Sequence, residues 1–133
     1  MTLACEIDLR DFEKFTQKLT EADRRIPQLA DAAVQLTANE GTRFVKEKTP
    51  HITGNLRRGF QVHKLGEMVW RIYNYIVYAP FIETGERHDP RYGVVLRRAG
   101  PANMVAGSLT EIRERLAVNI GKMLDSAIFF MKG

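Results

Sequence analysis

The middle of the chain places a helix stop, a strand, a glycine turn and a second strand in direct succession, and this order limits the fold more than any other feature. Pro50 ends the helix before it, because its ring disfavours helical geometry in the preceding residue and it has no amide hydrogen. Residues 68–73 alternate in character and are rich in β-branched and aromatic side chains, which is typical of a half-buried strand. Gly66 separates them from the mixed run 56–65. The pattern therefore predicts an antiparallel hairpin over residues 56–74.

An almost wholly apolar segment, residues 75–82, follows the hairpin. Pro80 suits the first turn of a helix but not a central strand, so residues 80–84 are expected to form a short helical turn that ends at Gly85. Glu83 is the single acid at the end of this segment. We expect Glu83 to be either the partner of a nearby arginine or the exposed face of the turn.

The N-terminal part of the chain has the apolar spacing of helices. Asp8 is expected to cap a first helix, whose apolar face recurs at helical intervals as far as Ala22. Pro27 can begin a second helix, although the two could instead form one kinked helix. Gly41 weakens the second helix by about 1 kcal/mol relative to alanine, which indicates a bend or a close contact at that point.

The C-terminal helix is the clearest element in the sequence. Residues 108–111 read Ser-Leu-Thr-Glu, the form of a capping box, and apolar side chains recur at intervals of three and four from Leu109 to Phe130. Burial of this stripe would cover the hairpin. The predicted fold class is α+β, with a small antiparallel β-sheet packed against N-terminal helices and a long C-terminal helix. The hairpin 56–74 would form the sheet, and residues 92–97 are a candidate for an extra strand.

The length of 133 residues predicts a single domain, residues 1–133. Within it, residues 86–103 are long for a loop in a small domain, and such loops are usually functional or disordered. We expect this stretch to be an assembly arm that is mobile until it meets a partner.

The formal net charge of +4 is carried by the middle of the chain. Residues 51–101 hold eight basic and four acidic side chains, so this segment has a surplus of four and the remainder is balanced. A basic patch of this kind can attract the phosphates of nucleic acid or an acidic protein surface, or it can be a solvated face with no partner. The basic side chains are Arg57, Arg58, Lys64, Arg71, Arg87, Arg91, Arg97 and Arg98.

Several classes of protein are disfavoured by the sequence. A single cysteine, Cys5, excludes an intrachain disulfide, fits a reducing cytoplasm and is expected to be a buried, inert thiol. No run approaches the ~20 apolar residues of a membrane-spanning helix, and the N-terminus lacks the order of a signal peptide. We therefore expect the protein to stay where it is made.

Catalytic and metal-binding patterns are also missing from the sequence. His51, His63 and His88 are scattered and lack the spacing of a metal site, and there is no glycine-rich phosphate loop. No cofactor or metal is therefore expected. A small ribonuclease that uses His63 or His88 as acid and base beside arginines is an alternative.

Two short motifs flank the predicted hairpin. The first reads Thr-Gly-Asn-Leu-Arg at 53–57, and the second reads Tyr-Ala-Pro-Phe-Ile-Glu-Thr-Gly at 78–85. With the terminal helices around them, their order and spacing resemble the tail-completion, or head-to-tail joining, family of small virion proteins in long-tailed double-stranded-DNA phages. The longer, basic stretch after the second motif departs from that family, in which a compact Pro-Phe-Leu type segment is expected. The matching positions are Thr53, Gly54, Leu56, Arg57, Tyr78, Ala79, Glu83 and Gly85.

The resemblance implies a structural virion protein and not an enzyme. It implies a ring of several copies, expected to be six, at the head-proximal end of the tail, which completes or terminates the tail tube and enables head-tail joining. The implied partners are the tail tube protein and the head connector or adaptor proteins, and genomic DNA would pass through the ring. Assembly would take place in the host cytoplasm without a membrane, and the protein would end in the virion at the head-tail junction.

The basic surface provides candidate contact residues for such a ring. Charge pairs at a subunit interface mainly set its register, while buried apolar surface provides most of the affinity. A basic nucleic-acid-binding module that uses the same surface is the alternative function. The expected interface cations are Arg57, Arg58, Arg71, Arg87, Arg91, Arg97 and Arg98, with Glu83 as a candidate counter-charge.

Overall fold

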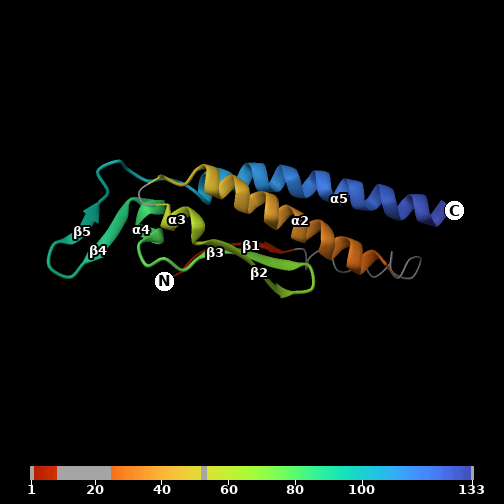
Figure 1. The fold of residues 1–133 in the computed structure, drawn as a ribbon, viewed down its shortest axis with the longest axis horizontal. Coiled ribbons are helices and arrows are strands. Elements are labelled where there is room, and N and C mark those ends of the chain that lie inside the picture. Colours follow the sequence, from red (N-terminus) through yellow and green to blue (C-terminus); the bar gives the residue numbers. More distant parts are fainter. Residues whose placement is uncertain (1, 9–24, 52–53, 133) are drawn as a thin grey trace.

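The computed structural model describes residues 2–8, 25–51 and 54–132, and for residues 127–132 it describes the backbone only. Its class is α+β, as predicted, with a sheet below two long helices and a small hairpin at one end (Figure 1). The elements in chain order are β1 Leu3–Asp8, α2 Ile26–Glu47, α3 Asn55–Arg58, β2 Phe60–Gly66, β3 Val69–Asn74, α4 Ala79–Thr84, β4 Glu86–Asp89, β5 Gly93–Leu96, the 3-10 helix η2 Ala106–Ser108, and α5 Leu109–Lys132.

The predicted central hairpin is present as β2 and β3, which pair antiparallel across the turn after Gly66. Its predicted start at residue 56 is wrong, because residues 55–58 form the short helix α3. Tertiary contacts explain the difference: Leu56 is buried, and its carbonyl accepts a hydrogen bond from the Asn74 side chain at 2.8 Å. The strand β2 therefore begins at Phe60.

A third strand, β1, was not predicted and pairs with the other edge of β3, which gives the sheet order β1-β3-β2. Cys5 lies opposite Ile72, and Ile7 lies opposite Trp70. Asp8 is the last residue of β1. The first predicted helix falls on residues 9–24, outside the described residues.

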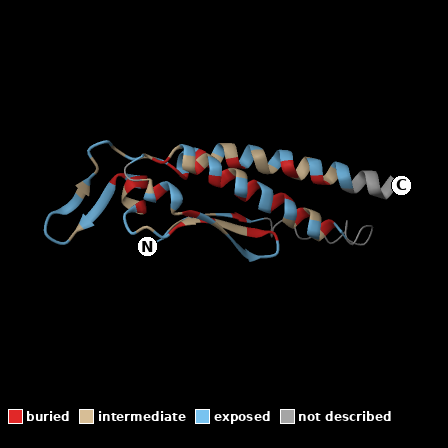
Figure 2. Ribbon diagram, viewed as in Figure 1, coloured by how far each residue is buried: buried red, intermediate tan, exposed pale blue. Residues whose placement is uncertain are grey.

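The two long helices form layers on one side of the sheet, because α2 packs on the strands and α5 packs on α2. Gly41 marks a close contact, as expected: a Cβ atom there would lie 2.9 Å from Cδ1 of Ile72 and 3.0 Å from Cγ1 of Ile112. Buried positions run along α2, whereas the β4–β5 hairpin is almost wholly exposed (Figure 2). Fully buried side chains that build the core include those of Ile26, Val34, Val45, Leu56, Ile72 and Met104.

A buried polar cluster joins α2 to α5. The Asn119 amide donates to Oγ1 of Thr37 at 2.9 Å and to Oε1 of Glu40 at 3.0 Å, and Arg115 donates to the same carboxylate. Burial favours the neutral form of Glu40, but the hydrogen bonds from Arg115 and Asn119 outweigh it and lower its pKa below the usual value. These contacts fix the register of the two helices.

The predicted capping box at the start of α5 is wrong. The Ser108 hydroxyl donates to the Met104 carbonyl at 2.6 Å, and Glu111 forms an ion pair with Lys48 instead of turning back to the helix end. The helix is preceded by the 3-10 turn η2, whose first amides have another acceptor, described below. No helix among the described residues is both long enough and apolar enough to cross a membrane.

The predicted extra strand at 92–97 is present as β5, which spans Gly93–Leu96. It does not join the three-stranded sheet and instead pairs antiparallel with β4. The Asp89 carboxylate shapes the connection, since it accepts hydrogen bonds from the backbone amides of Arg91 and Tyr92 at 2.7 and 3.2 Å. Residues 86–96 are called the arm below.

Candidate interaction surfaces

The base of the arm is fixed to the fold by Glu83, the last buried residue of α4. Its carboxylate accepts hydrogen bonds from the backbone amide of Val105 at 2.9 Å and from that of Ala106 at 3.0 Å. Glu83 is 7% exposed, so both earlier expectations for it, an arginine partner or an exposed face, are wrong. The carboxylate satisfies the amides at the start of η2 and ties the chain after the arm to the chain before it.

Backbone contacts close the same junction. The amide of Arg97 donates a hydrogen bond to the carbonyl of Gly85 at 2.6 Å. The amide of Ala102 donates one to the carbonyl of Ile82 at 2.9 Å. Gly85 has φ of 75°, and a Cβ atom on it would lie 2.9 Å from the nitrogen of Pro101. A glycine is therefore required where the arm leaves α4.

The arm exposes large apolar side chains. Tyr92, Val94 and Leu96 are 78%, 61% and 70% exposed. The arm projects from one end of the molecule and contacts the rest of the described fold mainly through α4 (Figure 1). An isolated two-stranded hairpin is only marginally stable in water, and exposed apolar side chains gathered on one element mark contact sites.

A pocket of about 510 Å³ lies beside the arm. Phe81 of α4 forms part of its wall, and the Arg87 guanidinium stacks over the Phe81 ring at 5.7 Å from the ring centre. Val77, which is 94% exposed, adds apolar surface at its rim. The pocket thus combines apolar surface of α4 and the segment before it with the Arg87 guanidinium of the arm.

The outer face of the three-stranded sheet is the side away from α2 and α5. On it, Arg71 pairs with Glu6, and the Tyr73 hydroxyl donates to Gln61 at 3.0 Å. The Tyr73 and Tyr75 rings lie 4.5 Å apart between centroids. Desolvation and the neighbouring Tyr75 raise the pKa of Tyr73. This polar and aromatic face is a second candidate surface.

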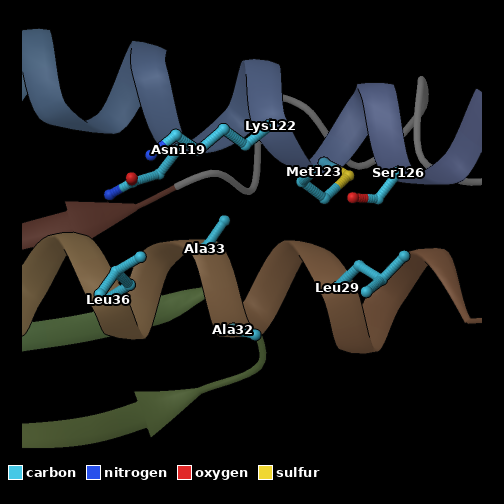
Figure 3. A pocket seen from close by; sticks show the side chains of 8 residues that line it. All are labelled: Leu29, Ala32, Ala33, Leu36, Asn119, Lys122, Met123 and Ser126. Carbon is cyan, nitrogen blue, oxygen red and sulfur yellow. The ribbon is translucent and has the colours of Figure 1, made fainter.

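A shallow apolar groove of about 210 Å³ lies between α2 and α5 (Figure 3). Leu29 and Leu36 lie on the α2 side, and Met123 lies on the α5 side with Lys122 near the rim. Leu36 is half exposed.

The family of the chain follows from a match over residues 13–85 to the model described as "Bacteriophage HK97-gp10, putative tail-component". The chain belongs to this family. The match covers more than half of the sequence and includes α2, α3, the central hairpin and α4, and it ends at Gly85, directly before the arm. No curated protein and no solved structure matches the chain.

The motif residues of this tail component mostly have structural roles in the described part of the chain. Leu56 and Ala79 are buried, and Gly54 and Gly85 have positive φ angles. Tyr78 is partly exposed and precedes the first turn of α4. Thr53 lies outside the described residues. The motifs therefore maintain the turns on either side of the hairpin.

The candidate interface arginines lie on three separate parts of the tail component and not on one surface. The first pair is on α3, where Arg57 donates to the Thr49 carbonyl at 3.2 Å and Arg58 to the Asn55 side chain at 2.6 Å. Arg71 is on the outer sheet face, and Arg97 donates to the Gly100 carbonyl at 2.7 Å. The side chains on or next to the arm are Arg87, Arg91, Arg97 and Arg98.

The described residues contain no group of three or more His, Cys, Asp or Glu side chains that could hold a metal ion. His63 is on β2 and His88 is on β4, so the two histidines of the ribonuclease alternative belong to different sheets. Cys5 is only half buried on β1, and desolvation raises the pKa of its thiol.

Proposed function

We propose that this tail component assembles as a homo-oligomeric ring, expected to contain six copies, at the head-proximal end of the phage tail. The ring completes or terminates the tail tube and prepares it for joining to the head. Its partners are the tail tube protein and the connector or adaptor proteins of the head, and genomic DNA passes through its lumen. The role is assembly and not catalysis.

The arm is the observation that carries this proposal. Three large apolar side chains on a projecting two-stranded hairpin are costly to leave in water, and contact with another protein removes them from it. The arginines at the edge of the arm favour an acidic surface on that protein. A contact with the next component along the tail axis satisfies both requirements.

Electron microscopy of lysates tests the proposal, using the parent phage with this gene disrupted. The expected result is filled heads beside unattached tails, and overlong tails would specify termination of the tube. Reintroduction of the intact gene in trans is the control and should restore joined particles. Intact infectious particles without the gene would overturn the joining role.

The nucleic-acid-binding alternative relies on the same arginines. The exposed aromatic ring of Tyr92 beside Arg91 is the observation that favours it, because a base can stack on such a ring while a cation contacts the phosphate. The neighbouring Val94 and Leu96 have no such use, and they favour contact with a protein.

A further inference from the structure

The outer edges of the three-stranded sheet pair with no other strand in the part of the chain that the structure describes. The sheet order β1-β3-β2 makes β1 and β2 the edges. An edge strand presents a row of N–H and C=O groups that can pair with a strand of another chain. Adding a strand at such an edge is a common mode of protein association.

The two edge strands are matched in direction and in register. Both run antiparallel to β3, so they run parallel to each other. Cys5 of β1 and Val62 of β2 both lie opposite Ile72 of β3, so these three residues form one row across the sheet. The next residue of each edge strand forms the next row in the same way. A row keeps its side chains on one face of the sheet. A second copy placed beside the first in the same orientation therefore sets its β1 against β2 with both apolar faces toward the helices.

The side chains of the outer face favour this arrangement. One row reads Glu6, Arg71, His63, in which Glu6 accepts a hydrogen bond from Arg71 and His63 is exposed at the β2 edge. Continuing the row brings His63 of one copy beside Glu6 of the next, as donor and acceptor. Pairing of β1 with a second β1 would instead gather the acids Glu6 and Asp8 on one face, which is unfavourable.

We propose that β2 of one copy pairs in parallel with β1 of the next copy, with Phe60–Lys64 beside Leu3–Ile7, and that this joins the sheets of neighbouring subunits into one continuous sheet. The inference rests on the proposed ring, because a contact between two different edges in one orientation is the kind that closes into a ring. The register shift between Lys64 and Gly66 ends the paired region.

Disulfide trapping in purified virions tests this pairing. In a Cys5→Ser background, Ala4→Cys and Gln61→Cys are introduced together, because both residues are exposed and share a row through Tyr73. Within one chain β3 separates them by about 10 Å, whereas a disulfide needs Cα atoms within about 7 Å. Any disulfide between these cysteines is therefore formed between copies.

The expected result is loss of the monomer band and a ladder of cross-linked multimers under oxidising conditions. The matched control combines Ala4→Cys with Leu65→Cys, which moves one cysteine four residues along β2, beyond the paired region, and should leave the monomer. A ladder from the control pair instead, or a dimer from either single cysteine variant, would overturn the proposed register or the head-to-tail pairing. Absence of any cross-link in joined particles would overturn the strand pairing and leave the ring proposal intact, whereas normal particles after gene disruption would remove the ring proposal itself.

Discussion

At the scale of single residues, the Glu83 carboxylate is the contact on which the geometry of the arm depends. Replacing Glu83 with alanine leaves the buried amide of Val105 without its acceptor. We expect Glu83→Ala to lower the free energy of unfolding by about 1–3 kcal/mol, because a buried donor that loses its partner retains its desolvation cost. Urea denaturation measures the change. The exposed neighbour Glu86→Ala is the control and should change stability by no more than about 0.5 kcal/mol, and equal effects of the two would contradict the capping role.

Two helical glycines provide a second test at this scale. Alanine at Gly121 of α5 has no atom within 4 Å of its Cβ, so it should stabilise the fold by up to about 1 kcal/mol through helix propensity. Alanine at Gly41 gains the same propensity but presses on Ile72 and Ile112, and overpacking of a core costs about 1–3 kcal/mol. We expect opposite signs in thermal or urea unfolding. Stabilisation by Gly41→Ala would contradict this expectation and show that α2 can move away from the sheet and α5 at little cost.

The Asp31 carboxylate links α2 to the central hairpin and makes stability depend on pH. It accepts hydrogen bonds from the Met68 amide at 2.9 Å and from Trp70 Nε1 at 3.2 Å. Burial favours the neutral form, but these bonds and Lys64 outweigh it and lower the pKa of Asp31 below 3.8. Because its pKa is lowered in the folded state, the ionised Asp31 carboxylate contributes to the free energy of unfolding above pH 3.8, and this contribution is lost as the pH falls further.

We therefore expect the free energy of unfolding to fall between pH 4 and pH 2 by less in Asp31→Asn than in the unchanged protein, since the asparagine has no such proton to bind. Urea titrations at a series of pH values measure this difference. The control is Glu47→Gln, which alters an exposed pair with Arg43 at 3.9 Å. Parallel pH profiles for the protein and Asp31→Asn would contradict the assignment.

At the scale of elements, the sequence predicted those whose residues carry a strong local pattern. The alternation around Trp70 and the glycine at 66 predicted the hairpin, and the stripe from Leu109 predicted α5. By contrast, β4 reads Glu-Arg-His-Asp, which has no strand preference of its own, and it forms because β5 pairs with it. The short β1 was missed because its partner β3 lies more than sixty residues away in the sequence, and because Asp8 at its end has the character of a helix cap.

The candidate surfaces were harder to predict than the fold. Arginine content indicated a single basic region, yet the structure divides these side chains among α3, the sheet face and the arm. Glu83 was singled out as the odd residue, but its carboxylate accepts hydrogen bonds from the amides of Val105 and Ala106, which are 22 and 23 residues later. The sequence around a carboxylate does not indicate that it will accept a hydrogen bond from a distant backbone amide.

The arm gives the prediction at the scale of an element. Replacing Val94 and Leu96 with serine removes apolar surface that is exposed in the free subunit, so the free energy of unfolding should change by no more than about 0.5 kcal/mol for each. If the arm contacts the next tail or head component, joined particles and plaque titre should fall by at least about tenfold, the effect of ~1.4 kcal/mol on a binding constant. Electron microscopy and titration measure both.

The control for the arm is Val118→Ser, an exposed apolar residue on α5 that lies away from the arm. It should leave the titre unchanged. Normal joining by the double arm variant would place the contact elsewhere and weaken the proposed function.

At the scale of the whole molecule, salt separates a ring contact from binding to nucleic acid. If the four arginines on or next to the arm neutralised four phosphates, affinity for duplex DNA would fall ~150-fold between 50 and 200 mM salt. The reason is that each neutralised phosphate makes the slope of log affinity against log salt concentration steeper by about 0.9. A ring held by strand pairing and apolar contacts has no such steep dependence. We expect no tight binding of a random duplex at 150 mM salt in fluorescence anisotropy. Tight binding that is lost with salt and in the Arg91→Gln, Arg98→Gln variant would favour the nucleic-acid function over assembly, since those two changes leave Val94 and Leu96 in place.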